Sequence, residues 1–252
     1  MNKKQRFVVI SDIHGYYNEM IKALSEADFN PQTDWLISLG DNMDRGPDNA
    51  NVVRFLNKLP NKVLIRGNHC DLLEQCCKRG YWEPHDYSNG TFDSICELGD
   101  AGLGNTFDEC CDTAWKKVKP FFNKMVDYFE TKNYIFVHSF IPLINKDGLP
   151  MYYIRNRDFA FNPDWRNASK EDWEEARWGN PFDLAKDGFL PDKTLVFGHW
   201  GVEHKWAEVE GREEFNKDAH FDPYYGDGYI GIDATTAYSG RVNVLVLEDE
   251  FI

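Results

Sequence analysis

The sequence predicts an α/β protein in which strands and helices alternate and pack in layers. Short apolar runs are each followed by a segment with apolar residues at helical spacing, and this pair occurs three times in succession from the N-terminus. Further apolar runs follow near the C-terminus. A chain of 252 residues with 42% hydrophobic residues is long enough to bury one large core or two small ones. We expect a single domain over residues 1–252 with one insertion.

The three strand–helix pairs are bounded by ordinary start and stop signals. Pro47 lies near the N-terminal end of the second predicted helix, where proline is favoured, and Gly80 follows the third, where glycine commonly ends a helix. The predicted strands cover residues 6–10, 35–39 and 62–65, and the helices that follow them cover 16–27, 48–58 and a segment that begins at Asp71.

The rest of the chain is less regular. Residues 81–112 contain four glycines and no clean period, so no structure is assigned there. A helix followed by a strand is predicted through residues 115–138, with the strand at 134–137. Residues 142–191 are rich in Trp, Asn, Asp and Pro, which favours an insertion over the surface of the core. Three more strands are expected at residues 194–197, 229–232 and 242–247.

Five predicted strands are each followed by a potential metal ligand. Because the carboxyl ends of strands in layered α/β folds form one rim where sites assemble, these side chains are expected to converge. An isolated Asp-x-His pair is more often a capped helix start, but five such coincidences with five strands favour a metal site. The candidate ligands are Asp12, His14, Asp41, Asn68, His138 and His199.

The charge balance and hydropathy exclude several classes of partner. A formal net charge of −14 disfavours binding to nucleic acid through a basic face. No apolar stretch approaches the roughly 20 residues of a membrane helix, and the apolar run at residues 7–10 is too short for an export signal. We therefore expect a cytoplasmic protein without a membrane partner.

The six cysteines all fall between Cys70 and Cys111. They include two adjacent pairs but no CxxC motif of the kind that zinc ribbons use. Reduced thiols packed in or near the core are the simpler interpretation.

Taken together, the motifs resemble the phosphoprotein phosphatase branch of the calcineurin-like metallophosphoesterases, particularly its bacterial and phage members. The resemblance rests on D-x-H at Asp12 and His14, G-D-x-x-D-R-G from Gly40 to Gly46, G-N-H from Gly67 to His69, His138, and Gly198-His199. It spans most of the chain but is thin over residues 81–131 and 142–191. It implies a layered fold in which central β-sheets form a sandwich flanked by helices.

The resemblance also implies a dinuclear metal site. Asp12, His14 and Asp41 would hold one divalent ion, while Asp41, Asn68, His138 and His199 would hold the other, so that Asp41 bridges the two. Nitrogen and oxygen ligands together suit Mn, Fe or Zn better than Ca, and Mn is the first choice. In this family a hydroxide that bridges the metals attacks phosphorus in line with the leaving oxygen.

Further residues resemble the family's catalytic and substrate-binding groups. His69 is similar to the general acid, Asp44 to the carboxylate that orients it, and Arg45 to a guanidinium that binds phosphate oxygens, with Asn68 also near the phosphate. Arg177 is the choice for a second phosphate-binding arginine, but Arg155 and Arg157 compete with it, and a solvated arginine is an equal alternative.

Two residues depart from the family pattern. Cys70 stands where relatives commonly have an acidic residue, and Trp200 stands where they commonly have Thr. Both departures concern the substrate pocket rather than the metal site. Trp200 could narrow the rim, offer a stacking face, or simply pack.

The expected function is hydrolysis of phosphomonoesters, on a phosphorylated protein (Ser, Thr or Tyr phosphate) or a small phosphorylated substrate. The first alternative is a dinucleoside polyphosphate (tetraphosphate) hydrolase with the same metal site. A non-catalytic binding module is a second alternative, and the full set of candidate ligands argues against it. A phosphodiesterase acting on nucleic acid is a third, which the acidic charge disfavours.

Overall fold

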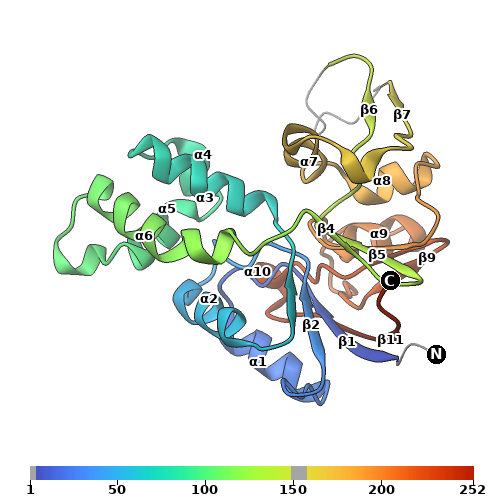
Figure 1. Ribbon diagram of the computed structural model, residues 1–252, viewed down its shortest axis with the longest axis horizontal. Coiled ribbons are helices and arrows are strands. Elements are labelled where there is room, and N and C mark those ends of the chain that lie inside the picture. The colour runs from blue at the N-terminus through green and yellow to red at the C-terminus, as the bar shows by residue number, and fades with distance from the viewer. Residues whose placement is uncertain (1–3, 149–157) are drawn as a thin grey trace.

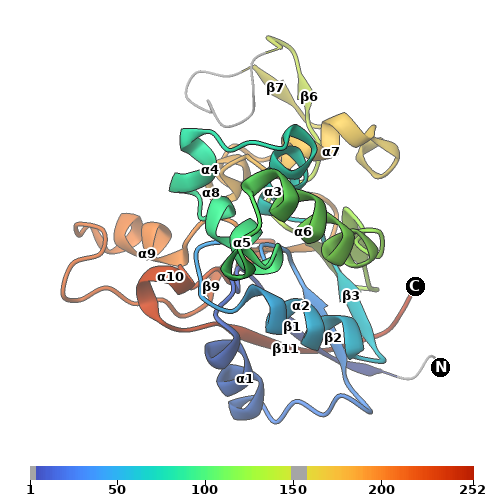
Figure 2. The ribbon, with the colours of Figure 1, turned by 90° about the vertical axis from the view of Figure 1, so that its left-hand side faces the viewer.

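The computed structural model describes residues 4–148 and 158–252. Two β-sheets lie face to face, and helices cover the outer face of each (Figures 1 and 2). The first sheet has the order β11-β1-β2-β3 and the second the order β4-β5-β8-β10-β9, while β6 (Ile144–Asn145) and β7 (Phe159–Ala160) form a separate hairpin. The α/β class and the sandwich arrangement predicted from the sequence are confirmed.

The first sheet is built from the strands that precede the N-terminal motifs. β1 (Gln5–Ile10), β2 (Trp35–Ser38) and β3 (Lys62–Leu64) run parallel, whereas β11 (Val244–Asp249) pairs antiparallel with β1. The register places Ile10 opposite Ser38, and Ser38 opposite Leu64. The three parallel strands therefore end at the same level, and the loops that follow them meet at one edge of the sheet.

The second sheet brings the two C-terminal histidine motifs to the same edge. β5 (Tyr134–Val137), β8 (Thr194–Phe197) and β10 (Tyr229–Gly231) run parallel, with β4 (Tyr128–Glu130) and β9 (Tyr224–Gly226) antiparallel at the two sides. His138 follows β5 and His199 follows β8 with one residue between. Ligand candidates from both sheets thus face the same rim.

Alternate residues of each strand point into different cores. Phe7 and Val9 of β1 pack between the sheets against the second sheet's Phe136 and Val196. Val8 lies among the helices outside the first sheet. Because both faces of these strands are buried, they read in sequence as continuous apolar runs rather than as alternating ones.

Residues from five helices share one core with the outer face of the first sheet. α2 begins where the Asp48 side chain accepts the Asn51 backbone N–H at 3.3 Å, and α3 ends at Gly80, whose φ of 76° is left-handed as a C-terminal glycine allows. The predicted start of α3 at Asp71 is three residues late, because the helix follows Gly67 at once. The five helices are α1 (Tyr17–Glu26), α2 (Asn49–Lys58), α3 (Asn68–Arg79), α5 (Thr91–Leu98) and α6 (Phe107–Phe122).

Residues 81–112, for which no structure was assigned, are largely helical. They contain α4 (Pro84–Ser88), α5, a 3-10 turn at Ala101–Leu103 and the start of α6, whose capping box joins Thr106 and Glu109. In Figure 1 this group extends to one side of the first sheet. All six cysteines are free thiols, and five of them are buried in the core beneath these helices, so the reduced-core interpretation is confirmed.

The described part of residues 142–191 packs against the outer face of the second sheet. Trp165, Trp173 and Phe182 from this segment are buried with Ile135 and Leu195 of the sheet. These three aromatic residues therefore belong to a core rather than to an open surface. The helices on this side are α7 (Lys170–Ala176), α8 (Pro181–Lys186) and α9 (Val202–Glu210), with a 3-10 turn at Trp165–Asn167, while α10 (Thr236–Ser239) precedes β11.

None of the helices in the described part of the chain combines the length and apolarity needed to cross a bilayer.

Candidate metal centre

The loops that carry the candidate ligands have an unusual backbone. Ten non-glycine residues in the described ranges adopt a positive φ, and six of them belong to the predicted site. Such conformations cost about 1–3 kcal/mol each and persist where the surrounding structure holds them. Asp, Asn and His tolerate them best, which suits the residue types found here. The six are Asp12, His14, Asp41, Asp44, Arg45 and His199.

Backbone hydrogen bonds join the first two loops into one unit. The N–H of Asp12 donates to the carbonyl of Gly40 at 3.2 Å, and the N–H of His14 donates to the carbonyl of Asp41 at 2.9 Å. These bonds continue the parallel pairing of β1 and β2 beyond the ends of the strands. Asp12, His14 and Asp41 are therefore fixed relative to one another by the pairing of the two strands.

Two glycines allow the ligand loops to approach more closely than a side chain would permit. A Cβ on Gly67 would collide with the backbone nitrogen and carboxylate of Asp41, and a Cβ on Gly198 would collide with Ser11 and Asp12. These glycines, which lie beside Asn68 and His199, therefore let neighbouring loops touch.

All six predicted ligands gather around Asp41. Asp41 Oδ2 lies 3.4 Å from His138 Nε2 and 3.9 Å from His14 Nε2. Asp12 Oδ1 lies 4.0 Å from His14 Nε2, and Asn68 Oδ1 lies 2.8 Å from His138 Nε2. The atoms of Asp41, His138 and His199 are close enough to share one ion, as are those of Asp41, His14 and His69. Asp41 belongs to both groups.

Two of the histidines are oriented by backbone carbonyls. His14 Nδ1 lies 3.0 Å from the Met43 carbonyl, and His138 Nδ1 lies 2.9 Å from the Leu39 carbonyl. A proton on each Nδ1 donates to that carbonyl and leaves Nε2 facing Asp41. Metal-binding histidines are commonly held in this way, so the donor set and its orientation fit a divalent ion.

The site is buried and brings several carboxylates close together. Burial raises the pKa of Asp12 well above its usual value, and the nearby carboxylate of Asp233 adds to the effect. Burial opposes ionisation of Asp41 too, but the charges of His138 and His69 hold the Asp41 pKa well below its usual value. Three buried carboxylates close together favour a bound cation.

The histidines of the cluster respond to burial in opposite directions. Burial and the positive charge of His138 lower the pKa of His199 to about 3. His138 itself is also buried, but the adjacent Asp41 carboxylate outweighs this and raises the His138 pKa to about 9. Without a metal, a proton on His138 supplies part of the positive charge that the carboxylates require.

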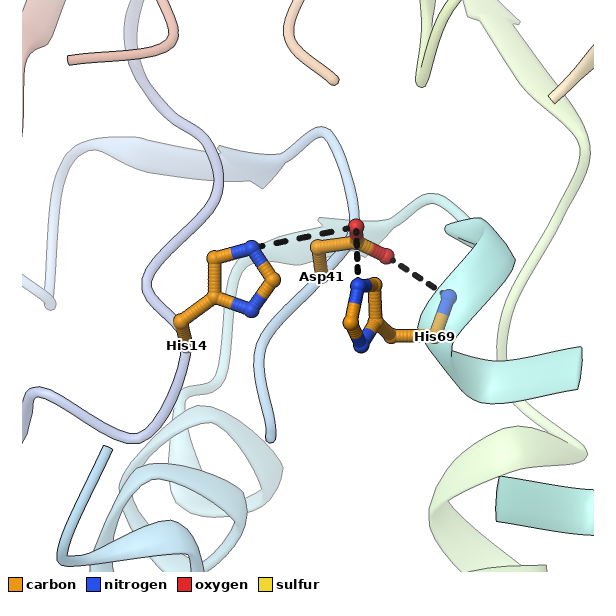
Figure 3. A group of neighbouring side chains, drawn as sticks. All are labelled: His14, Asp41 and His69. Atoms are coloured by element: carbon orange, nitrogen blue, oxygen red, sulfur yellow. Dashed lines mark hydrogen bonds and ion pairs between the residues drawn. The ribbon is translucent and has the colours of Figure 1, made fainter. Parts of the chain in front are cut away.

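His69, Asp44 and Arg45 lie beside the candidate ligands. Figure 3 shows the His69 ring next to Asp41, with Nε2 of His69 at 3.9 Å from Asp41 Oδ2. Nδ1 of His69 is 2.8 Å from Asp44 Oδ2. Arg45 is exposed, and its guanidinium nitrogens lie 3.2 Å from Nε2 of His14 and 3.1 Å from Nε2 of His69. By distance alone, His69 fits either a proton donor or a ligand.

Arg177 has a different environment from Arg45. It is buried, and its ion pairs join Asp71 at 3.2 Å and Asp127 at 3.4 Å rather than any predicted ligand. The next residue, Trp178, does reach the centre, because its backbone hydrogen-bonds to the His199 ring. The competing residues Arg155 and Arg157 lie outside the described residues.

Cys70 and Trp200, the two departures from the family pattern, lie in different environments. Cys70 is buried beneath the site, with its thiol 3.7 Å from the sulfur of Met125, and burial raises its pKa to about 12. Trp200 is 37% exposed, and its ring centre lies 6.2 Å from that of His199. Cys70 therefore packs in the core, whereas Trp200 offers an aromatic surface at the rim.

The structure adds residues that the sequence did not single out as part of the site. Thr91 donates a hydrogen bond to Asp44, and Asn49 accepts one from the Asp44 backbone at 2.8 Å. Asp233 is buried near Asp12 and Asp41, and burial raises its pKa to about 6. Thr91 lies in the segment without a recognisable period, so no local signal pointed to it.

Two face-to-face sheets with a cluster of histidines and carboxylates at their common rim define a layered α/β protein of the metallophosphoesterase class. The model of the calcineurin-like phosphoesterase family matches residues 5–235. The chain belongs to this family, which confirms the resemblance noted in the sequence.

Among the relatives is serine/threonine-protein phosphatase 2 of Salmonella typhimurium (strain LT2), which is 46% identical over 61 residues, 24% of this chain and 28% of that protein. Another is the symmetrical bis(5'-nucleosyl)-tetraphosphatase of Erwinia tasmaniensis, 48% identical over 62 residues, 24% of this chain and 23% of that protein. The match thus spans about a quarter of the length of each relative.

The fold is also similar to that of a solved structure, a cold-active protein-tyrosine phosphatase of a psychrophilic Shewanella species. The TM-score is 0.56 at 12% identity, and the alignment covers 96% of this chain and 75% of the other. At this identity the similarity concerns the fold alone.

Proposed function

We propose that this chain is a metal-dependent phosphoesterase that hydrolyses phosphomonoesters, with phosphorylated protein side chains as the preferred substrates. The observation that carries the proposal is that the loops after five strands converge on Asp41, which belongs to two separate groups of potential ligands. Arg45 supports a phosphate ligand, because its planar guanidinium is directed into the same space.

Asp12, His14 and Asp41 would hold one divalent ion, and Asp41, Asn68, His138 and His199 the other. The ligand chemistry suits manganese, with iron and zinc as alternatives. Two bound cations supply a strongly acidified water and positive charge for the phosphoryl oxygens.

The protein's own groups would act on the two ends of the reacting bond. Arg45 binds phosphoryl oxygens through its paired N–H groups and orients the phosphorus. When the bond from phosphorus to the leaving oxygen breaks, His69 gives its Nε2 proton to that oxygen. Asp44 stabilises the charged ring through Nδ1, as its 2.8 Å contact allows.

A second candidate function is hydrolysis of dinucleoside tetraphosphates. The observation in its favour is the exposed Trp200 next to His199, since an aromatic face at the rim can stack on a base. A relative with that activity in its name matches the same proportion of this chain as the protein phosphatase does.

A hydrolysis panel separates the two functions. Purified protein with added Mn²⁺ is assayed on a phosphoserine peptide, p-nitrophenyl phosphate and a dinucleoside tetraphosphate, each with and without a chelator. We expect the highest kcat/KM on the phosphopeptide and no turnover with chelator. If the tetraphosphate is preferred and Trp200→Ala raises its KM alone, the second function is correct. Turnover that resists chelation would refute both.

A further inference from the structure

Helix α5 is fitted closely to the loop that carries Asp44 and Arg45, although the two are far apart in sequence. Gly90, which precedes the helix, has a left-handed φ of 80°, and a Cβ there would collide with the Arg45 backbone. Near the other end of α5, Glu97 accepts hydrogen bonds from the side chain of Asn49 at 2.6 Å and its backbone N–H at 3.1 Å. The position of this loop therefore depends on α5.

Within this contact, Thr91 reaches the Asp44 carboxylate directly. Thr91 is fully buried, and its hydroxyl donates to Asp44 Oδ2 at 2.6 Å. His69 Nδ1 lies 2.8 Å from the same oxygen, whereas Asp44 Oδ1 has no hydrogen-bond partner among the described residues. Two donors thus converge on one oxygen of a carboxylate that is itself fully buried.

This convergence fixes the rotation of the carboxylate. The terminal torsion of Asp is broad, so the side chain alone does not determine the orientation of the carboxylate plane. A second donor on Oδ2 does determine it. The His69 ring is then held by a carboxylate whose own orientation is fixed, and its Nε2 faces Arg45 and Asp41.

The neighbouring Ser94 shows what a purely structural hydroxyl does in this helix. Ser94 is equally buried, and its hydroxyl donates to the backbone carbonyl of Gly90, one turn earlier, at 3.1 Å. Thr91 makes no such bond within its helix, and its hydroxyl is directed at Asp44 instead. The two residues therefore form a matched pair in which only Thr91 contacts the site.

We propose that Thr91 is a positioning residue for the reaction, acting through Asp44 to hold His69 where it delivers its proton to the leaving oxygen. In this role Thr91 would act on the reaction only through Asp44, its hydrogen-bond partner. The inference rests on the proposed phosphoesterase function and adds to it a residue from the helical segment.

The test compares an ester that needs a proton on its leaving oxygen with one that does not. Phosphoserine loses an alkoxide, whereas p-nitrophenolate departs readily as the anion. Thr91→Val keeps the branched shape and removes the donor, so kcat on phosphoserine should fall by about 10- to 100-fold, as for other residues that orient catalytic groups. The fall on p-nitrophenyl phosphate should be smaller, with KM and bound Mn²⁺ unchanged.

Further variants complete the experiment. Thr91→Ser retains the hydroxyl and should restore the ratio of the two kcat values, and Ser94→Ala should leave it unchanged. In an Asp44→Asn background, Thr91→Val should lower the ratio no further, because its effect passes through Asp44. If Thr91→Val proves unstable by thermal unfolding, Thr91→Ala is compared with Thr91→Ser in the same assays.

The outcomes distinguish this inference from the proposed function. If the wild-type protein hydrolyses both esters but the donor-free variants keep the wild-type ratio, Thr91 has no positioning role. Equal slowing on both esters would also overturn the inference, because it indicates a general structural effect. A wild-type protein that hydrolyses neither ester with Mn²⁺ would refute the proposed function and this inference together.

Discussion

Replacing His69 with Asn separates the two roles that the geometry of this side chain allows. The ring lies close enough to Asp41 to share an ion, and it also contacts Asp44 as an oriented proton donor would. The substitution preserves two neighbouring contacts. The backbone N–H of residue 69 still donates to Asp41 Oδ1 at 3.0 Å, and Asp44 keeps the hydrogen bond from Thr91. We therefore expect a folded His69→Asn variant that binds both metals.

The expected loss falls on kcat. General acid catalysis supplies about 100- to 10,000-fold, which corresponds to about 2.7–5.5 kcal/mol at about 1.36 kcal/mol for each factor of ten. The full loss should appear with phosphoserine, whose leaving oxygen requires the proton. Hydrolysis of p-nitrophenyl phosphate should slow much less.

The assay measures Mn²⁺ content by elemental analysis and kcat on both esters for the wild type and the variant. His85→Asn is the control, because His85 is a half-exposed histidine on α4 with no contact to the candidate ligands among its ion pairs. Loss of Mn²⁺ from His69→Asn would make the residue a ligand. Equal slowing of both esters would show that its proton is not used by the leaving group.

Three other predictions concern substrate binding, loop packing and pH. Arg45→Ala should lower kcat/KM by about 100- to 10,000-fold, since it would remove two charge-assisted hydrogen bonds to phosphoryl oxygens, of about 1.5–3 kcal/mol each. Arg54→Ala should leave kcat/KM unchanged, and an unchanged value in Arg45→Ala would exclude that residue from the site. Gly67→Ala should abolish tight Mn²⁺ binding, because the new Cβ would displace Asp41. Gly102→Ala should leave Mn²⁺ binding unchanged, because a Cβ there meets no neighbour. Retained Mn²⁺ binding in Gly67→Ala would contradict the close contact between Gly67 and Asp41. In the metal-free protein the His138 pKa of about 9 exceeds its usual 6.5, so its contribution to stability is full below pH 6.5 and is lost as pH rises through about 9. Mn²⁺ must displace the proton on His138 in order to bind there, so the Mn²⁺-induced rise in Tm should grow as pH rises through the same range. A rise in Tm that does not depend on pH would contradict the assignment of His138 as a metal ligand.

The framework of the site was predictable because its residues follow the strands directly. Asp12, Asp41 and Asn68 come just after buried apolar runs, and parallel strands bring their ends to one edge. The same reasoning located His138 and His199 at the ends of two strands of the second sheet. The bounds of the buried strands β1, β2, β5 and β8 were predicted to within about one residue, since both faces of these strands are buried, whereas β4, β6, β7 and β9 were not predicted.

The contacts that orient the site were not predictable in the same way. Thr91 and Asp44 are separated by 47 residues, and the chain between residues 81 and 112 shows no period from which α5 could be placed. The ion pairs of Arg177 with Asp71 and Asp127 likewise join segments that are far apart in the sequence. Such long-range pairings arise from tertiary packing and leave no pattern in the local sequence.

Counting bound ions tests directly whether Asp41 is shared between two metal ions. Metal-free wild-type protein and Asp41→Asn are titrated with Mn²⁺, and bound metal is measured by elemental analysis after dialysis, with phosphatase activity followed in parallel. We predict two ions per wild-type chain, activity that appears only with metal, and weakened binding of both ions together with loss of activity in Asp41→Asn. An Asp41→Asn protein that retains two tightly bound ions would show that Asp41 is not shared between them.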